Sequence, residues 1–152
     1  MSSLRLSLLI LSLLSLGCGS EEPRYVAHAG GTLGPGRNYS NSLEALERSY
    51  SDGLRLFEID FSWTADRHLV AIHDWTSNFE RFFDTTDLEQ DFVPTLDGFM
   101  AYRMKGGYTQ LDFESVDRWL QDHPDASIVT DIKSANIEGL HYVADRTADL
   151  SR

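Results

Sequence analysis

The chain has 152 residues, with 13 lysines and arginines against 24 aspartates and glutamates and a formal net charge of −11. This length allows one domain, and the acidic excess argues against nucleic acid as a partner, because binding a phosphate backbone requires clustered lysine and arginine. Cys18 is the single cysteine, which excludes a disulfide bond within the chain.

The first element in the chain is a targeting segment. Arg5 supplies a positive charge, and residues 6–16 form an apolar stretch of about eleven residues, shorter than the ~20 that cross a bilayer. The segment ends in the letters LSLGC at residues 14–18. This ending resembles the lipobox of bacterial lipoproteins, where cleavage leaves a lipid-bearing N-terminal cysteine. An ordinary signal peptide with an incidental cysteine is the alternative.

From this leader we expect three parts in the chain. Residues 1–18 are predicted to be a lipoprotein signal peptide with lipidation at Cys18, residues 19–23 a tether, and residues 24–152 the folded domain. A lipid anchor at Cys18 would hold the domain at the bacterial cell envelope, outside the cytoplasm, with the membrane as a partner.

The domain begins with a predicted strand, helix and strand. Residues 25–28 are a short apolar run that ends in His28 and leads into a glycine-rich turn. Asn41 is expected to cap a helix, with Glu44 as the other half of a capping box. A strand at residues 56–61 follows, and this order of elements predicts that the two strands are parallel.

The strand at residues 56–61 is apolar except at Glu58 and Asp60. Side chains alternate between the faces of a strand, so these two carboxylates share one face and the apolar residues take the other. Burying an acidic pair is costly unless something neutralises it, and a divalent cation is the obvious candidate. Solvated residues on an edge strand are the alternative. A polar turn then leads to a second strand at residues 69–73, which ends in His73.

The rest of the chain predicts helices around one further strand. Two helices precede it, and the apolar stripe of the second is read as core packing. The strand at residues 128–133 places Asp131 and Lys133 on one face. A final helix is expected over residues 137–150, with Leu140 facing inward.

Polar groups therefore close each of the four expected strands: His28, Glu58 with Asp60, His73, and Asp131 with Lys133. If the strands are adjacent and parallel, these groups converge at the end where parallel α/β folds carry their chemistry. Three carboxylates suit Mg²⁺ or Ca²⁺ rather than zinc. Two histidines beside such a metal suit acid–base work on a phosphate ester.

The order and spacing of these motifs resemble the glycerophosphodiester phosphodiesterase family, over about residues 25–149. The matching motifs are His28-Ala29-Gly30, the helix start at Asn41, Glu58-Ile59-Asp60, Thr64-Ala65-Asp66, His73-Asp74 and Asp131-Ile132-Lys133. The family belongs to the phospholipase-C-like phosphodiesterases. The resemblance therefore implies an α/β chain of the TIM (β/α)8 barrel type, here about the first half of the barrel.

The resemblance also implies a function in lipid metabolism. A metal-dependent hydrolase of this family would release glycerol 3-phosphate and an alcohol from a glycerophosphodiester or lysophospholipid-like substrate. The implied roles are Glu58, Asp60 and Asp131 as ligands of one Mg²⁺ or Ca²⁺, His28 and His73 as general acid and base, and Lys133 as a substrate contact. A salt bridge is the alternative role for Lys133.

Three positions depart from the family's pattern. Ala29 stands in place of an arginine and removes a cationic phosphate contact, Ser40 replaces an acidic residue, and Asp131 replaces the commoner glutamate. These departures concern substrate preference more than metal binding, because the carboxylate count at the matched metal positions is unchanged. A complete barrel takes roughly 200 residues or more. A truncated, non-catalytic, lipid-anchored half-barrel that binds a partner is therefore a second hypothesis.

Overall fold

A computed structural model describes residues 25–85, 89 and 91–152 of the chain. The predicted signal peptide, Cys18 and the tether lie outside the described residues. None of the helices within the described ranges is long and apolar enough to cross a membrane.

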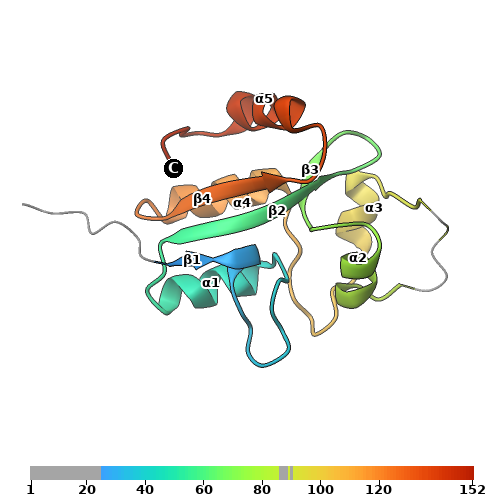
Figure 1. Ribbon diagram of the computed structural model, residues 1–152, viewed down its shortest axis with the longest axis horizontal. Coiled ribbons are helices and arrows are strands. Elements are labelled where there is room, and N and C mark those ends of the chain that lie inside the picture. Colours follow the sequence, from blue (N-terminus) through green and yellow to red (C-terminus); the bar gives the residue numbers. More distant parts are fainter. Residues whose placement is uncertain (1–24, 86–88, 90) are drawn as a thin grey trace, which may run out of the picture.

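The described residues form one mixed sheet with helices around it (Figure 1). The strands are β1 (Val26–Ala27), β2 (Leu56–Trp63), β3 (Leu69–Ala71) and β4 (Ser127–Ile132). The α-helices are α1 (Leu43–Ser51), α2 (Ser77–Phe82), α3 (Leu96–Ala101), α4 (Phe113–Asp122) and α5 (Asn136–Arg146). A single 3-10 turn, His28–Gly30, follows β1 directly.

β2 is the central strand, because it pairs with the other three strands. β1 and β4 lie parallel to β2, as predicted, and the register sets Asp60 beside Asp131. β3 is antiparallel to β2 and ends at Ala71, so the parallel arrangement considered for all four strands is wrong for this one. The physical reason is the short link at residues 64–68, since a parallel crossover takes about a dozen residues or more.

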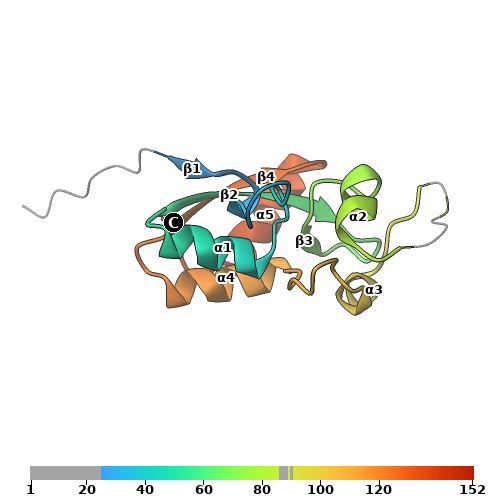
Figure 2. The same cartoon turned by 90° about the horizontal axis from the view of Figure 1, so that it is seen from below.

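Helices α1 and α4 cover the same face of the sheet (Figure 2). On this face the apolar side chains of β2 are buried and pack in one cluster with Leu46 of α1 and Trp119 of α4. The α4 stripe predicted to be core packing is confirmed, because Phe113, Val116, Trp119 and Leu120 are all buried. Each such side chain contributes about 1.5–3 kcal/mol by burial. The apolar face of β2 thus faces the helices, which leaves Glu58 and Asp60 on the other face.

A second apolar cluster supports the segment that follows β3. It joins Val70 and Ile72 to Phe79 of α2 and Phe99 of α3. This packing holds the chain from β3 to α2 against the rest of the domain. The position of His73 between β3 and α2 is therefore set by a packed cluster on both sides.

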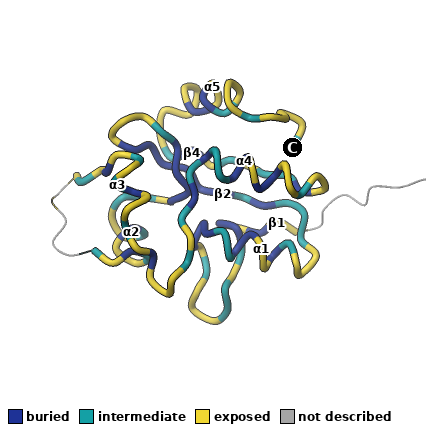
Figure 3. Tube along the Cα trace, turned by 180° about the vertical axis from the view of Figure 1, so that it is seen from behind, coloured by how far each residue is buried: buried dark blue, intermediate teal, exposed yellow. Residues whose placement is uncertain are grey.

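Helix α5 differs from the prediction in its length and its inward face. It ends at Arg146, and its buried residues are Gly139 and Tyr142. Leu140, predicted to face inward, is 58% exposed. The close packing of Gly139 against Ile132 sets the orientation of the helix. Much of α5 is exposed, whereas buried residues gather along β2 (Figure 3).

We expect Gly139→Ala to lower the free energy of unfolding by about 1–3 kcal/mol, because overpacking a close contact costs that much. An added Cβ would lie 2.6 Å from Ile132 Cδ1 and 2.8 Å from Ile132 Cγ2. At an ordinary helix position alanine is favoured over glycine by about 1 kcal/mol. Ala144→Gly, at an exposed position of the same helix, should therefore also destabilise. Urea unfolding of both variants checks the pair, and a more stable Gly139→Ala protein would contradict the close packing.

Candidate metal and catalytic site

Three carboxylates meet on the face of the sheet that α1 and α4 leave uncovered. Asp60 and Asp131 are paired across β2 and β4, and Glu58 lies two residues before Asp60 on the same face. One oxygen from each of the three lies within 4.8 Å of the others. Asp60 is buried, Glu58 is mostly buried, and Asp131 is exposed. The structure thus brings together the three residues that the sequence predicted as metal ligands.

Asn41 fixes the carboxylate and backbone of Asp60. Its Nδ2 donates to Asp60 Oδ2 at 2.9 Å, and its Oδ1 accepts from the Asp60 backbone N–H at 3.1 Å. Asn41 is buried and has a φ of 50°, in the left-handed region that asparagine tolerates better than most residues. Sequence reasoning did not place this residue in the site. The signal that could have found it is that a buried aspartate needs a polar partner.

The expected helix cap at Asn41 is wrong by one residue. Ser42 is the N-cap of α1, and its side chain accepts from the Ala45 backbone N–H. The predicted capping box is also absent from this helix start. The carboxylate of Glu44 instead accepts from the backbone N–H and the hydroxyl of Thr109. Asn41 is therefore free to turn toward β2.

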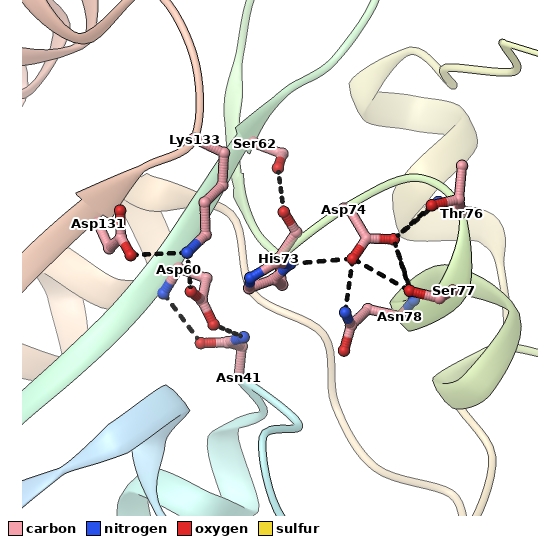
Figure 4. A network of polar contacts seen from close by, with 10 residues as sticks. All are labelled: Asn41, Asp60, Ser62, His73, Asp74, Thr76, Ser77, Asn78, Asp131 and Lys133. Carbon is pink, nitrogen blue, oxygen red and sulfur yellow. Dashed lines mark hydrogen bonds and ion pairs between the residues drawn. The ribbon is translucent and has the colours of Figure 1, made fainter.

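Lys133 lies between two of the three carboxylates. Its Nζ is 2.6 Å from Asp60 Oδ1 and 2.6 Å from Asp131 Oδ2 (Figure 4). Burial alone would lower the pKa of Lys133, but the hydrogen bond to Asp131 and the contact with Asp60 outweigh burial and raise that pKa. The side chain is therefore charged at neutral pH. The structure shows the salt-bridge alternative, and substrate contact by Lys133 remains a prediction.

The donor set fits a hard divalent cation. Asp60 Oδ1 is buried, and its close polar contact among the described residues is the Lys133 ammonium, 2.6 Å away. Burial raises the pKa of Glu58, and the negative charges of Asp60 and Asp131 add to this rise, although the Ala29 backbone N–H opposes it. Lys133 thus supplies one positive charge beside a cluster of three carboxylates, two of which it contacts. Oxygen atoms up to 4.8 Å apart can share a Ca²⁺ ion, which binds oxygen at about 2.3–2.6 Å.

His28 lies at the edge of the carboxylate cluster. It begins the turn after β1, and its Nε2 is 3.6 Å from Glu58 Oε2. The next residue supplies the backbone N–H of Ala29, which donates to the same oxygen at 2.8 Å. On its other side the imidazole contacts the ring of Tyr39, with 4.9 Å between the ring centroids. The side chain is 64% exposed, so its imidazole is accessible from solvent.

His73 is brought back alongside β2 by the antiparallel hairpin. The Ser62 hydroxyl donates to the His73 carbonyl oxygen at 3.1 Å, which ties this residue to β2. On the opposite side, His73 Nδ1 lies 2.9 Å from Asp74 Oδ2 (Figure 4). An ionised Asp74 favours the tautomer that carries its proton on Nδ1, which leaves Nε2 available for proton transfer.

Asp74 is held ionised by a set of hydrogen-bond donors. Partial burial opposes ionisation, but the side chain and backbone N–H of Asn78, together with His73 and Thr76, outweigh it and lower the pKa of Asp74. The distances are 2.6 Å from Asn78 Nδ2 and 3.0 Å from the Asn78 backbone nitrogen. Asp74 therefore anchors the start of α2 and orients His73 at the same time.

We expect Asp74→Ala to lower the free energy of unfolding at pH 7 by about 1–3 kcal/mol, because several donors lose their acceptor. The lowered pKa means that the carboxylate contributes fully above its ordinary value of 3.8, and that the contribution is lost as the pH falls below it. Urea unfolding at pH 7 and pH 3 should show the difference between the two proteins shrinking. Asp145→Ala, at an exposed position of α5, is the control. An Asp74→Ala deficit that stays constant with pH would contradict the linkage.

Comparisons with a family model and with solved structures both find glycerophosphodiester phosphodiesterases. The family model described as the glycerophosphoryl diester phosphodiesterase family matches residues 29–148. A search of curated protein sequences finds no match. A solved glycerophosphoryl diester phosphodiesterase from Parabacteroides distasonis is 28% identical, with a TM-score of 0.65 over 81% of this chain and 43% of that one. A glycerophosphodiester phosphodiesterase from the same organism is 22% identical, with a TM-score of 0.58 over 80% and 53%.

The chain therefore spans about half the length of these solved proteins. Over that half it has their arrangement of parallel strands and helices. This confirms the predicted fold class, an α/β chain that forms about half of a TIM barrel.

Proposed function

Because the chain belongs to the glycerophosphoryl diester phosphodiesterase family, we propose that it hydrolyses a glycerophosphodiester to glycerol 3-phosphate and an alcohol with the help of one divalent cation. The observation that carries the proposal is the meeting of three carboxylate oxygens within 4.8 Å of one another. His28 Nε2 lies 3.6 Å from Glu58 Oε2 of this cluster, and His73 follows β3, which pairs with β2. The three carboxylates and two histidines therefore come from four different strands or the residues that follow them.

The carboxylates of Glu58, Asp60 and Asp131 would hold the cation. A bound Mg²⁺ or Ca²⁺ offsets charge on the phosphoryl oxygens and lowers the pKa of a bound hydroxyl. Asn41 keeps Asp60 in place through two hydrogen bonds. This support lets the protein hold its ligands in position before the cation or the substrate arrives.

The two histidines move the protons. One imidazole removes the proton from the attacking oxygen. When that oxygen belongs to water, the product is glycerol 3-phosphate directly; when it belongs to the substrate's own glycerol hydroxyl, the product is a cyclic phosphate that a water molecule then opens to glycerol 3-phosphate. The other imidazole gives a proton to the leaving alcohol oxygen, so that the P–O bond breaks without releasing an alkoxide. Asp74 keeps His73 oriented for this transfer. Lys133 supplies a positive charge to the phosphate, a role made more important because Ala29 replaces the family's arginine.

The test is product formation by the full chain. With millimolar Mg²⁺ or Ca²⁺, glycerophosphoglycerol and glycerophosphocholine should release glycerol 3-phosphate, and a chelator should stop the reaction reversibly. A folded, metal-binding protein that releases no glycerol 3-phosphate from any glycerophosphodiester would overturn the proposal. That result would support the non-catalytic, partner-binding half-barrel instead.

We also propose that the domain is anchored at the outer side of the bacterial cytoplasmic membrane or in the outer membrane through a lipid on Cys18. The support for this is the LSLGC sequence at the end of the apolar leader. Cys18→Ser should move the protein from the membrane fraction to the soluble fraction after expression in a bacterium. A variant that stays with the membrane as fully as the unaltered chain would contradict the lipid anchor.

A further inference from the structure

A small basic cavity lies beside the candidate site. Its volume is about 270 Å³, and its lining includes Arg37, Arg81 and Lys105 but no aspartate or glutamate of the described chain. This is unusual in a chain that has 24 acidic and 13 basic residues. A larger cavity of about 700 Å³ adjoins it, but there the basic residues share the lining with Asp84. We call the smaller cavity the basic pocket.

Three separate segments build the basic pocket. Arg37 comes from the loop after β1, Arg81 from α2, and Lys105 from the connection between α3 and α4; Figure 1 shows these segments below the sheet. Arg37 Nη1 donates to the Tyr108 hydroxyl at 2.8 Å, which ties two of the walls together. The Lys105 backbone N–H donates to the Phe82 carbonyl at 2.7 Å and ties the third. The walls are therefore fixed to one another.

The basic pocket and the candidate site share the loop that leads into α1. Ser40 lies in its lining, and the next residue is Asn41, which binds Asp60. The residue before Ser40 is Tyr39, whose ring contacts His28. The loop that lines the basic pocket therefore continues directly into the two residues that contact His28 and Asp60.

The charges of the pocket call for an anion. Among the described residues, no carboxylate lies within ion-pair distance of Arg37, Arg81 or Lys105, although six other lysine and arginine side chains form such pairs. Positive charges gathered without a counter-charge repel one another. A guanidinium group binds phosphate in a two-pronged manner, and lysine adds a point charge.

We propose that the basic pocket binds a phosphate group on the alcohol part of the substrate, so that the preferred substrates are glycerophosphodiesters of a phosphorylated alcohol. The catalytic consequence rests on the proposed function, whereas the binding itself does not. A phosphomonoester in this pocket would hold the leaving alcohol in place while the phosphodiester lies at the carboxylates.

The test compares two molecules that differ by one phosphate group: glycerophosphoglycerol, and the same molecule phosphorylated on its terminal hydroxyl. Calorimetric titration of the full chain in chelator measures binding without turnover. The phosphorylated molecule should bind at least tenfold more tightly. Arg37→Gln and Lys105→Gln should each remove most of this advantage, whereas Arg118→Gln, which deletes a charge at an exposed position of α4, should leave it intact.

The outcomes are separable. Equal affinity for the two molecules, or an advantage that survives in both pocket variants, would overturn the inference, provided that circular dichroism shows the variants folded. If inorganic phosphate binds as tightly as the phosphorylated diester, the pocket is a free-phosphate site and the substrate preference is wrong. Tight, pocket-dependent binding without hydrolysis after metal is restored would support the pocket and overturn only the proposed activity.

Discussion

Replacing Glu58 with glutamine should remove metal binding and hydrolysis together while leaving the fold intact. Loss of an outer-shell partner costs about 10–100-fold in metal affinity, and loss of one of three carboxylate ligands should cost more. The glutamine oxygen can still accept the hydrogen bond from the Ala29 backbone N–H. Calorimetric titration with Mg²⁺ and Ca²⁺, beside a glycerol 3-phosphate assay, measures both losses.

The free energy of unfolding of the Glu58→Gln protein, measured in chelator, shows whether lost metal binding comes from the missing ligand or from unfolding. The pKa of Glu58 is raised above its ordinary value of 4.5, so its ionised form disfavours folding at neutral pH when no cation is bound. The variant should therefore be at least as stable as the unaltered chain in chelator. Asp145→Asn, which removes a carboxylate at an exposed position of α5, is the control. Undiminished turnover of Glu58→Gln would contradict the assigned ligand.

Replacing His73 with glutamine should lower kcat by about 10²–10⁴-fold, the usual contribution of a positioned acid or base. Metal affinity should stay within about twofold, because no His73 atom belongs to the carboxylate cluster. This combination separates a proton-transfer role from a ligand role. His141→Gln, at an exposed position of α5, should change neither quantity. A His73→Gln protein with normal kcat would show that another group moves the proton.

The carboxylate cluster was predictable because it follows from local rules. Alternation along β2 placed Glu58 and Asp60 on one face, and parallel pairing brought Asp131 beside Asp60. Side-chain alternation applies to every β-strand, whatever the rest of the fold. The nearness of His28 to Glu58 follows from the same parallel pairing, since β1 is the neighbour of β2.

Other features could not be read from the sequence because they depend on tertiary contacts. Asn41 looks like a helix cap in isolation, and only the approach of β2 gives it Asp60 as a partner. The salt bridges of Lys133 with Asp60 and Asp131 depend on the distance between β2 and β4, which the sequence does not give. The inward face of α5 is decided by Gly139 packing on Ile132, whereas the pattern of apolar residues favoured Leu140.

The most direct test of the central claim is the stoichiometry of divalent-cation binding by the metal-free full chain. Calorimetric titration with Mg²⁺ and with Ca²⁺ should show one ion per chain, with binding lost in Glu58→Gln and in Asp131→Asn and retained in His73→Gln. Absence of binding, or binding that both carboxylate variants retain, would contradict a metal site built from these residues.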